Sequence, residues 1–186
     1  DYIYFQDSEY DSDEREIVCR YPQFFAARLL KQSIIKSVVE KSAKGGTYFG
    51  ATGCGKSLAM LFLARKLMRS PKLESPTILL ITDRSDLDDQ LSSQFIKAKH
   101  FIGDETIEQI ESREELKTKL RGRASGGVFL TTIQKFSEDI NLLSDRSNII
   151  CISDEAHRSQ TNIDEATKIS YSDDGIATAI KKTYGF

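Results

Sequence analysis

The chain has 186 residues, of which 39% are hydrophobic and 29% charged, and its formal net charge is −2 at pH 7. It contains no apolar run long enough to span a membrane, no secretory signal and no overall basic field of the kind that marks many nucleic-acid binders. Its three cysteines, Cys19, Cys54 and Cys151, form no close pair, which argues against a disulfide framework or a zinc knuckle. We therefore expect a cytoplasmic protein with one sizeable core.

Both ends of the sequence suggest a piece of a longer polypeptide, because the chain has no initiator methionine and stops at "KKTYGF". Residues 1–19 are rich in Asp and Glu and predict a solvated arm or linker from an upstream domain, although Tyr4 and its aromatic neighbours could pack on something. Residues 20–186 are expected to form one domain.

The first helix is predicted from about Tyr21 to the Gly45–Gly46 pair, with Pro22 in its first turn. Short runs rich in β-branched residues then alternate with helical patterns. The predicted strands are 46–50, 77–82, 128–132 and 148–153, and the predicted helices are 56–69, 86–98 and 112–121. This alternation predicts an α/β fold, doubly wound, with a mostly parallel sheet and helices on both faces.

The stretch "GATGCGKS" at residues 50–57 matches the phosphate-binding pattern G-x-x-x-x-G-K-[ST] in full. Its glycines allow backbone N–H groups to point at the phosphates, and the helix that follows favours an anion at its start. Lys56 supplies a positive charge for the β- and γ-phosphates, and the Ser57 hydroxyl is a ligand for Mg²⁺. The candidate nucleotide-binding residues are therefore Gly50, Ala51, Thr52, Gly53, Cys54, Gly55, Lys56 and Ser57.

The run "NIICISDEAHRSQ" places two carboxylates at the end of a strand that we expect to be buried and parallel. Ligands bind at the carboxyl ends of such strands. We assign Asp154 to Mg²⁺ and Glu155 to the attacking water, as general base. The alternative is an acidic turn that only begins a helix.

Residues 154–157 read D-E-A-H, the signature of superfamily 2 helicases and translocases. Together with "TDRSDLDDQL" at 82–91 and "TTIQKF" at 131–136, this run resembles the first RecA-like motor domain of the restriction (R) subunit of type I restriction enzymes. The resemblance covers roughly residues 20–160. It implies ATP and Mg²⁺ as cofactors, with Lys56 and Glu155 as catalytic residues.

The resemblance also implies roles for residues outside the phosphate loop. Gln23 would read the adenine edge and select ATP over GTP. His157 would couple the nucleotide to the rest of the motor, whereas His100 has no such position and is expected to be structural. Contacts with DNA phosphates are expected from loop residues at the ends of two strands, namely Arg84, Gln134 and Lys135, although Arg84 could equally be a helix-entry residue.

The rest of such a subunit would lie outside this chain. The resemblance implies an endonuclease domain before residue 1, a second motor domain after residue 186, and as partners double-stranded DNA and the modification and specificity subunits. Without the second motor domain we expect the chain to bind ATP–Mg²⁺ weakly and to hydrolyse it slowly or not at all.

Three other functions remain open at this point. One is another superfamily 2 DNA or RNA helicase, against which the forms "DLDDQL" and "TTIQKF" argue. Another is a P-loop kinase, which would need an arginine-rich lid and an acceptor pocket. The third is an interaction module in which ATP is only structural.

Overall fold

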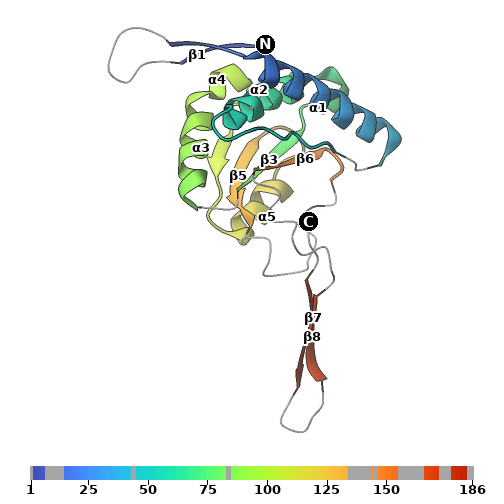
Figure 1. The fold of residues 1–186 in the computed structure, drawn as a ribbon. Coiled ribbons are helices and arrows are strands. Elements are labelled where there is room, and N and C mark those ends of the chain that lie inside the picture. Colours follow the sequence, from blue (N-terminus) through green and yellow to red (C-terminus); the bar gives the residue numbers. More distant parts are fainter. Residues whose placement is uncertain are drawn as a thin grey trace.

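The computed structural model describes residues 2–6, 15–42, 45–82, 85–133, 144, 146–154, 166–171 and 177–183 (Figure 1). Within these ranges the centre of the molecule is a sheet of four strands, and no helix is both long and apolar enough to cross a membrane. Two smaller antiparallel hairpins lie outside this sheet, one formed by β1 and β2 and the other by β7 (Ala166–Tyr171) and β8 (Ala177–Thr183).

The central sheet contains β3 (Thr77–Thr82), β4 (Ile107–Gln109), β5 (Val128–Thr132) and β6 (Ile149–Ser153), in the order β4-β5-β3-β6. All three neighbouring pairs are parallel. The predicted strands 77–82, 128–132 and 148–153 are thereby confirmed to within one residue, and the mostly parallel α/β sheet is confirmed with them. Strand β4 was not predicted, because its three residues are too short to show a period.

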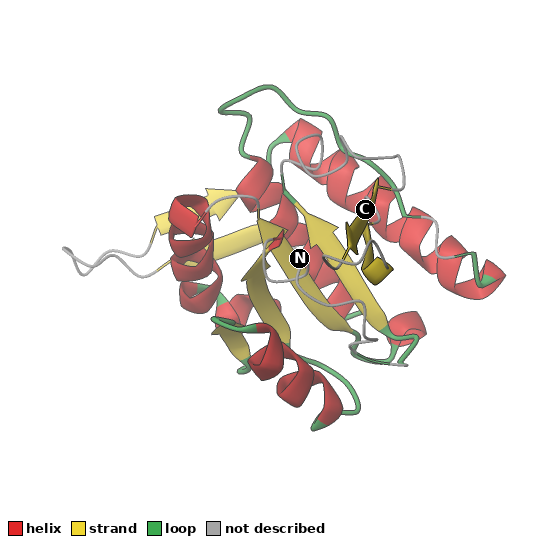
Figure 2. Cartoon of the chain, turned by 90° about the horizontal axis from the view of Figure 1, so that it is seen from below, coloured by secondary structure: helices red, strands yellow, loops and turns green. Residues whose placement is uncertain are grey.

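Helices cover both faces of this sheet, as predicted (Figure 2). Side chains of one strand alternate between the two faces. Ile78, Leu80 and Leu130 pack in one cluster with helices α2 (Lys56–Met68), α3 (Ser85–Lys97) and α4 (Lys99–Ile102). Leu79 and Phe129 pack on the opposite side with Leu116 and Leu120 of α5 (Arg113–Arg121). Ser112 caps the start of α5, since its hydroxyl accepts from the Glu115 N–H at 3.2 Å.

The N-terminal strands β1 (Ile3–Gln6) and β2 (Arg15–Val18) form an antiparallel hairpin that packs on the domain. Tyr4 is only 3% exposed and its ring lies 5.0 Å from that of Phe101. For these eight residues the predicted solvated arm is wrong and its stated alternative holds, because alternate aromatic side chains of β1 reach the core. Residues 7–14 lie outside the described residues.

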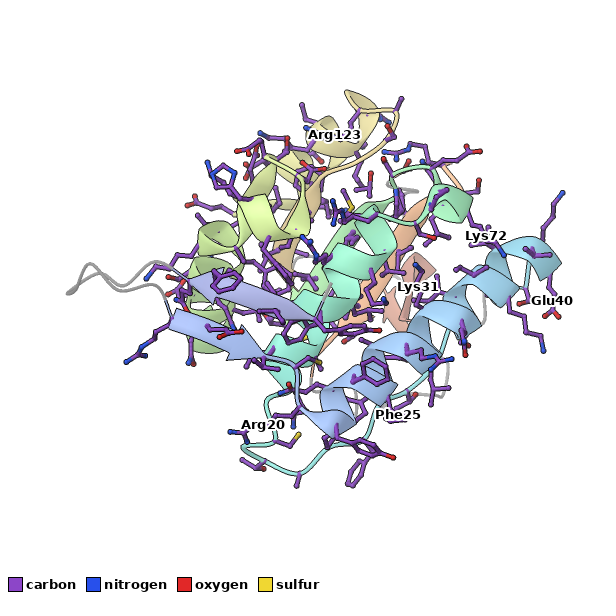
Figure 3. All side chains as sticks on the ribbon, turned by 90° about the horizontal axis from the view of Figure 1, so that it is seen from above. Arg20, Phe25, Lys31, Glu40, Lys72 and Arg123 are labelled. Atoms are coloured by element: carbon purple, nitrogen blue, oxygen red, sulfur yellow. The ribbon has the colours of Figure 1, made fainter. Side chains whose placement is uncertain are left out.

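Helix α1 (Tyr21–Glu40) follows the hairpin and crosses α2 (Figure 3, where Arg20 and Glu40 mark its two ends). It ends before the glycine pair named above, at Lys41, whose left-handed backbone (φ 51°) lets its N–H bond back to Ser37 and Val38 carbonyls. The next segment, 46–50, is not a strand in the structure, which corrects that prediction. The Ser33 hydroxyl donates to the Gly45 carbonyl at 2.7 Å and Phe49 is 95% exposed, so side-chain contacts with α1 replace a strand ladder here.

Strand β6 is less buried than predicted. Among the described residues it pairs with β3 alone, so it forms an edge of the sheet. Ile150 and Ile152 are partly buried against the main core cluster, whereas Cys151 is exposed. The expectation of a strand covered on both faces is therefore wrong within the part of the chain that the structure describes.

Candidate nucleotide-binding site

The phosphate loop runs without regular structure into the first turn of α2. Gly53 and Gly55 have φ of +78° and +83°, in the left-handed region that favours glycine. Gly55 is the N-cap residue of α2, and it has no side chain that could cap the N–H groups of the first turn. A helix start of this kind suits an anion, which the positive end of the helix dipole attracts.

Gln23, from the first turn of α1, holds this loop in place. Its side-chain amide donates to the carbonyl oxygens of Cys54 and Gly55, at 3.3 and 3.2 Å. Its amide oxygen accepts from the Arg20 N–H at 2.9 Å, and the residue is only 2% exposed. A Cβ added at Gly55 would overlap the Gln23 Nε2 atom. The structure thus joins Gln23 to the phosphate loop, a contact that sequence reasoning missed because no pattern pairs residues 32 positions apart.

A second close contact lies at the start of the loop. The Tyr48 hydroxyl and the Cys54 sulfur are 3.8 Å apart, and a Cβ added at Gly50 would lie 2.6 Å from that sulfur. This hydrogen bond, more than burial, raises the pKa of Tyr48. Ala51, Thr52 and Gly53, between these two contacts, are exposed and open to a ligand.

Lys56 and Ser57 are the first two residues of α2, and both are partly buried. Only residues 69–76 connect the end of α2 to the start of β3, and the two elements pack in one core. Because a 13-residue helix and a six-residue strand each span about 20 Å, the start of α2 lies toward the carboxyl end of β3.

Asp154 lies at that same edge of the sheet. It follows β6 directly, and its N–H donates to the Ile81 carbonyl of β3 at 2.8 Å, which extends the parallel pairing by one residue. It sits in a turn and is partly buried. The phosphate loop and this carboxylate therefore share the edge where parallel sheets bind ligands.

These residues fit a nucleotide and its metal. The start of α2, where the N-cap Gly55 offers no capping side chain, suits a phosphate, and the Ser57 hydroxyl and Asp154 carboxylate are the hard oxygen ligands that Mg²⁺ prefers. No group of three or more acidic, His or Cys side chains able to hold a metal by themselves occurs in the described ranges.

Several predicted site residues lie outside the described residues, and their roles stay predictions. They are Glu155 and His157 after β6, Arg84 after β3, and Gln134 and Lys135 after β5. Asp154, the residue just before Glu155, is at the expected position. Thr82 and Thr132, which end β3 and β5, are register partners in neighbouring strands, so both loops leave from one edge of the sheet.

The sequence has recognisable relatives. It is 43% identical over 169 residues to the type I restriction enzyme HindI endonuclease subunit of Haemophilus influenzae, which covers 86% of this chain and 16% of that protein. It is 37% identical over 156 residues to the "Putative type I restriction enzyme MjaIXP endonuclease subunit" of Methanocaldococcus jannaschii, covering 79% of this chain and 14% of the relative. The chain therefore spans about a sixth of the length of these relatives, and its resemblance to type I restriction subunits is confirmed.

The comparison with protein families gives a match to the SWI2/SNF2 ATPase family over residues 22–183. This range includes Gln23, the whole phosphate loop and Asp154, and it agrees with the RecA-like α/β fold described above. Because the match covers most of the sequence, the chain belongs to the SWI2/SNF2 ATPase family.

Proposed function

We propose that this chain is the ATP-binding motor domain of the R subunit of a type I restriction-modification enzyme, and that it couples ATP hydrolysis to translocation of double-stranded DNA before cleavage. The observation that carries the proposal is the phosphate loop at the start of α2, held by Gln23 and sharing a sheet edge with Asp154, in an ATPase-family chain. The two restriction-subunit relatives give the ATPase its context.

In this proposal each site residue has one task. The loop N–H groups and Lys56 bind the triphosphate, and Ser57 and Asp154 hold Mg²⁺, which would neutralise charge on the phosphates. Glu155 accepts a proton from the water that attacks the γ-phosphorus, and the products are ADP and inorganic phosphate. Gln23 steadies the loop, and His157 transmits the state of the nucleotide.

DNA and the partner domains act outside this pocket. Arg84, Gln134 and Lys135, in loops that leave β3 and β5 at one edge, contact the DNA backbone rather than its bases. A second motor domain completes the ATP site in the whole polypeptide, and modification and specificity subunits join it in the cytoplasm. Sequence recognition belongs to the specificity subunit.

Translocation measured on the polypeptide as its gene encodes it, assembled with its partner subunits, tests the proposal. An oligonucleotide bound as a triplex far from the recognition site should be displaced with ATP and not with a non-hydrolysable analogue. Lys56→Ala should abolish displacement and DNA-stimulated ATP turnover. Lys72→Ala is the matched control, since this exposed lysine lies beyond the end of α2 (Figure 3).

Two results would contradict the proposal. ATP turnover that does not respond to DNA would indicate a different enzyme, and separation of the two strands without displacement of the triplex would indicate a helicase instead.

A further inference from the structure

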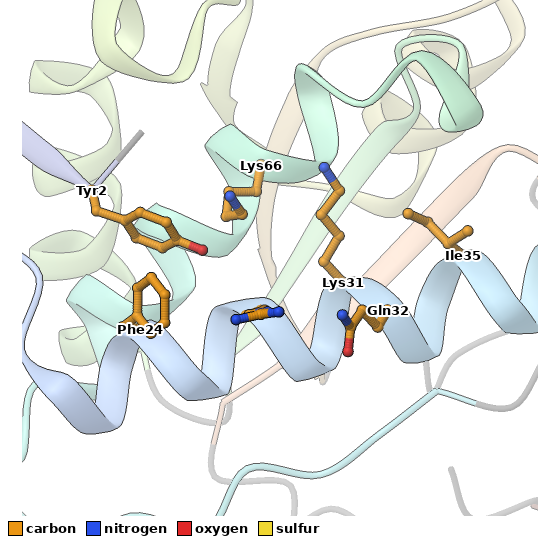
Figure 4. A pocket seen from close by; sticks show the side chains of 7 residues that line it. Tyr2, Phe24, Lys31, Gln32, Ile35 and Lys66 are labelled. Carbon is orange, nitrogen blue, oxygen red and sulfur yellow. The ribbon is translucent and has the colours of Figure 1, made fainter.

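A second pocket lies away from the phosphate loop, between the start of the N-terminal hairpin, α1 and α2 (Figure 4). Its volume is about 350 Å³, and no residue of the loop 50–57 lines it. The lining consists of three cations, two aromatic rings, a glutamine and an isoleucine, and the cations are Arg28, Lys31 and Lys66.

The charges of this pocket are of one sign. Arg28 and Lys31 are one turn apart on α1, and Lys66 reaches the same space from α2. Among the described residues, no carboxylate lines the pocket and Arg28 and Lys31 form no ion pair. Farther along the same helix, Lys36 does pair, with Glu40 at 3.7 Å. Partial burial and the nearby Lys66 lower the pKa of Lys31, as expected for a cation whose charge is not compensated.

Aromatic contacts fix the wall of the pocket. The Lys66 ammonium, from α2, lies 4.3 Å from the centre of the Tyr2 ring. The centre of the Phe24 ring, on α1, lies 4.6 Å from the centre of the Tyr2 ring. The Cys19 N–H donates to the Tyr2 carbonyl at 2.9 Å, so the backbone also holds Tyr2 in place. In Figure 4 the side chain of Lys31 extends from α1 toward α2, and the Tyr2 ring lies beside Phe24 and Lys66. Because these contacts already hold Tyr2 and Lys66, little further ordering of these two side chains is needed when a ligand binds.

We propose that this pocket binds a phosphate group, supplied either by a nucleic-acid strand or by a free nucleotide. A phosphate carries one negative charge within a strand and close to two at the end of a free nucleotide, and three converging cations favour either. Its oxygens accept hydrogen bonds from the paired N–H donors of the Arg28 guanidinium. The Gln32 amide adds a neutral donor. A volume of about 350 Å³ exceeds that of one phosphate and leaves room for the attached sugar, beside the aromatic wall.

Binding measurements on the chain with Lys56→Ala, which weakens the loop site, test the proposal. One probe is a fluorescent single-stranded oligonucleotide and the other is tripolyphosphate, which carries phosphate without a strand. The double variant Arg28→Gln/Lys31→Gln should bind at least one probe about tenfold more weakly, because two charge-assisted contacts are lost. The control Lys36→Gln/Lys72→Gln removes the same charge elsewhere and should change either affinity less than about twofold.

Each outcome is decisive. A loss for the oligonucleotide alone identifies a strand as the phosphate source, a loss for tripolyphosphate alone identifies a free ligand, and a loss for both leaves the phosphate itself as the recognised group. No loss for either probe beyond that of the control overturns the proposal.

A second measurement avoids any variant of the pocket and so does not depend on how the double variant folds. The probe that binds, whether the oligonucleotide or tripolyphosphate, should protect Lys31 from acetylation by acetic anhydride in the Lys56→Ala chain, with the extent read by mass spectrometry, and should leave Lys36 reactive. Equal acetylation of Lys31 in the presence and absence of each of the two probes would also overturn the proposal.

Discussion

Both the nitrogen and the oxygen of the Gln23 side-chain amide form hydrogen bonds with the backbone, and these bonds determine the effect that a substitution of Gln23 should have. The nitrogen donates to two loop carbonyls and the oxygen accepts from the Arg20 N–H. A residue with these contacts steadies the loop for any triphosphate. A residue that reads adenine, as the family resemblance implies, affects only adenine nucleotides.

The substitution Gln23→Met separates these two roles. It keeps the volume but leaves two partly buried carbonyls without their donor, which costs about 1–3 kcal/mol. If Gln23 acts on the loop, the affinities for ATP, GTP and tripolyphosphate should all fall by about tenfold. Calorimetric titration of the three ligands measures this, with Gln90→Met, exposed on α3 and outside both anion sites, as control. A loss confined to ATP would instead assign Gln23 to the adenine.

Gly55→Ala tests whether the phosphate loop tolerates a Cβ at the residue that contacts Gln23. The φ of +83° costs a residue with a Cβ about 1–2 kcal/mol, and the new Cβ would also overlap the Gln23 amide. We expect a lower melting temperature and more than tenfold weaker ATP binding. Gly103→Ala is the matched control, because its φ is +87° but its Cβ would meet nothing within 4 Å. If both variants bind ATP equally well, the contact with Gln23 has no role in the site.

At the scale of elements, strand β1 connects the hairpin to the core through one face only. Tyr4 is 3% exposed, whereas its neighbour Phe5 is 57% exposed. Tyr4→Ala should lower the free energy of unfolding by about 3 kcal/mol, the usual cost of removing a buried aromatic ring. Phe5→Ala should lower it by less than about 0.5 kcal/mol. Urea unfolding measures both. Equal small effects would mean that the hairpin is not part of the cooperative unit.

The same elements explain which predictions succeeded. Strands β3 and β5 and helix α2 consist mostly of apolar residues, which are buried whatever element they pack against. Their sequences were therefore sufficient to predict them. The segment 46–50 has three good strand residues between two glycines, but a strand also needs a partner, and no described strand pairs with it. The contact of Gln23 with the phosphate loop could not be predicted from the sequence for a related reason. The phosphate loop shows its pattern locally, whereas the residue that holds it is placed only by the packing of α1 on α2.

On the scale of the whole molecule, two separate surfaces are proposed to bind anions, although the net charge of the chain is −2. The phosphate loop and Asp154 lie at the carboxyl edge of the sheet, where the proposed Mg²⁺ and triphosphate would balance each other. The pocket between α1 and α2 is lined by three cations and, among the described residues, by no carboxylate. Net charge therefore does not predict where anions bind, because local clusters set the field at close range.

The chain alone should bind ATP–Mg²⁺ and turn it over far more slowly than a complete motor. In the proposed site the loop and Asp154 would contact one side of the nucleotide, and transition-state charge on the γ-phosphoryl group needs a further cation, commonly an arginine from another domain. We expect weak, Mg²⁺-dependent binding in calorimetry that Lys56→Ala removes and Lys72→Ala retains. Phosphate release should stay near background with or without duplex DNA. DNA-stimulated turnover of about 1 s⁻¹ or faster, within the ordinary range for enzymes, would show that the site is already complete.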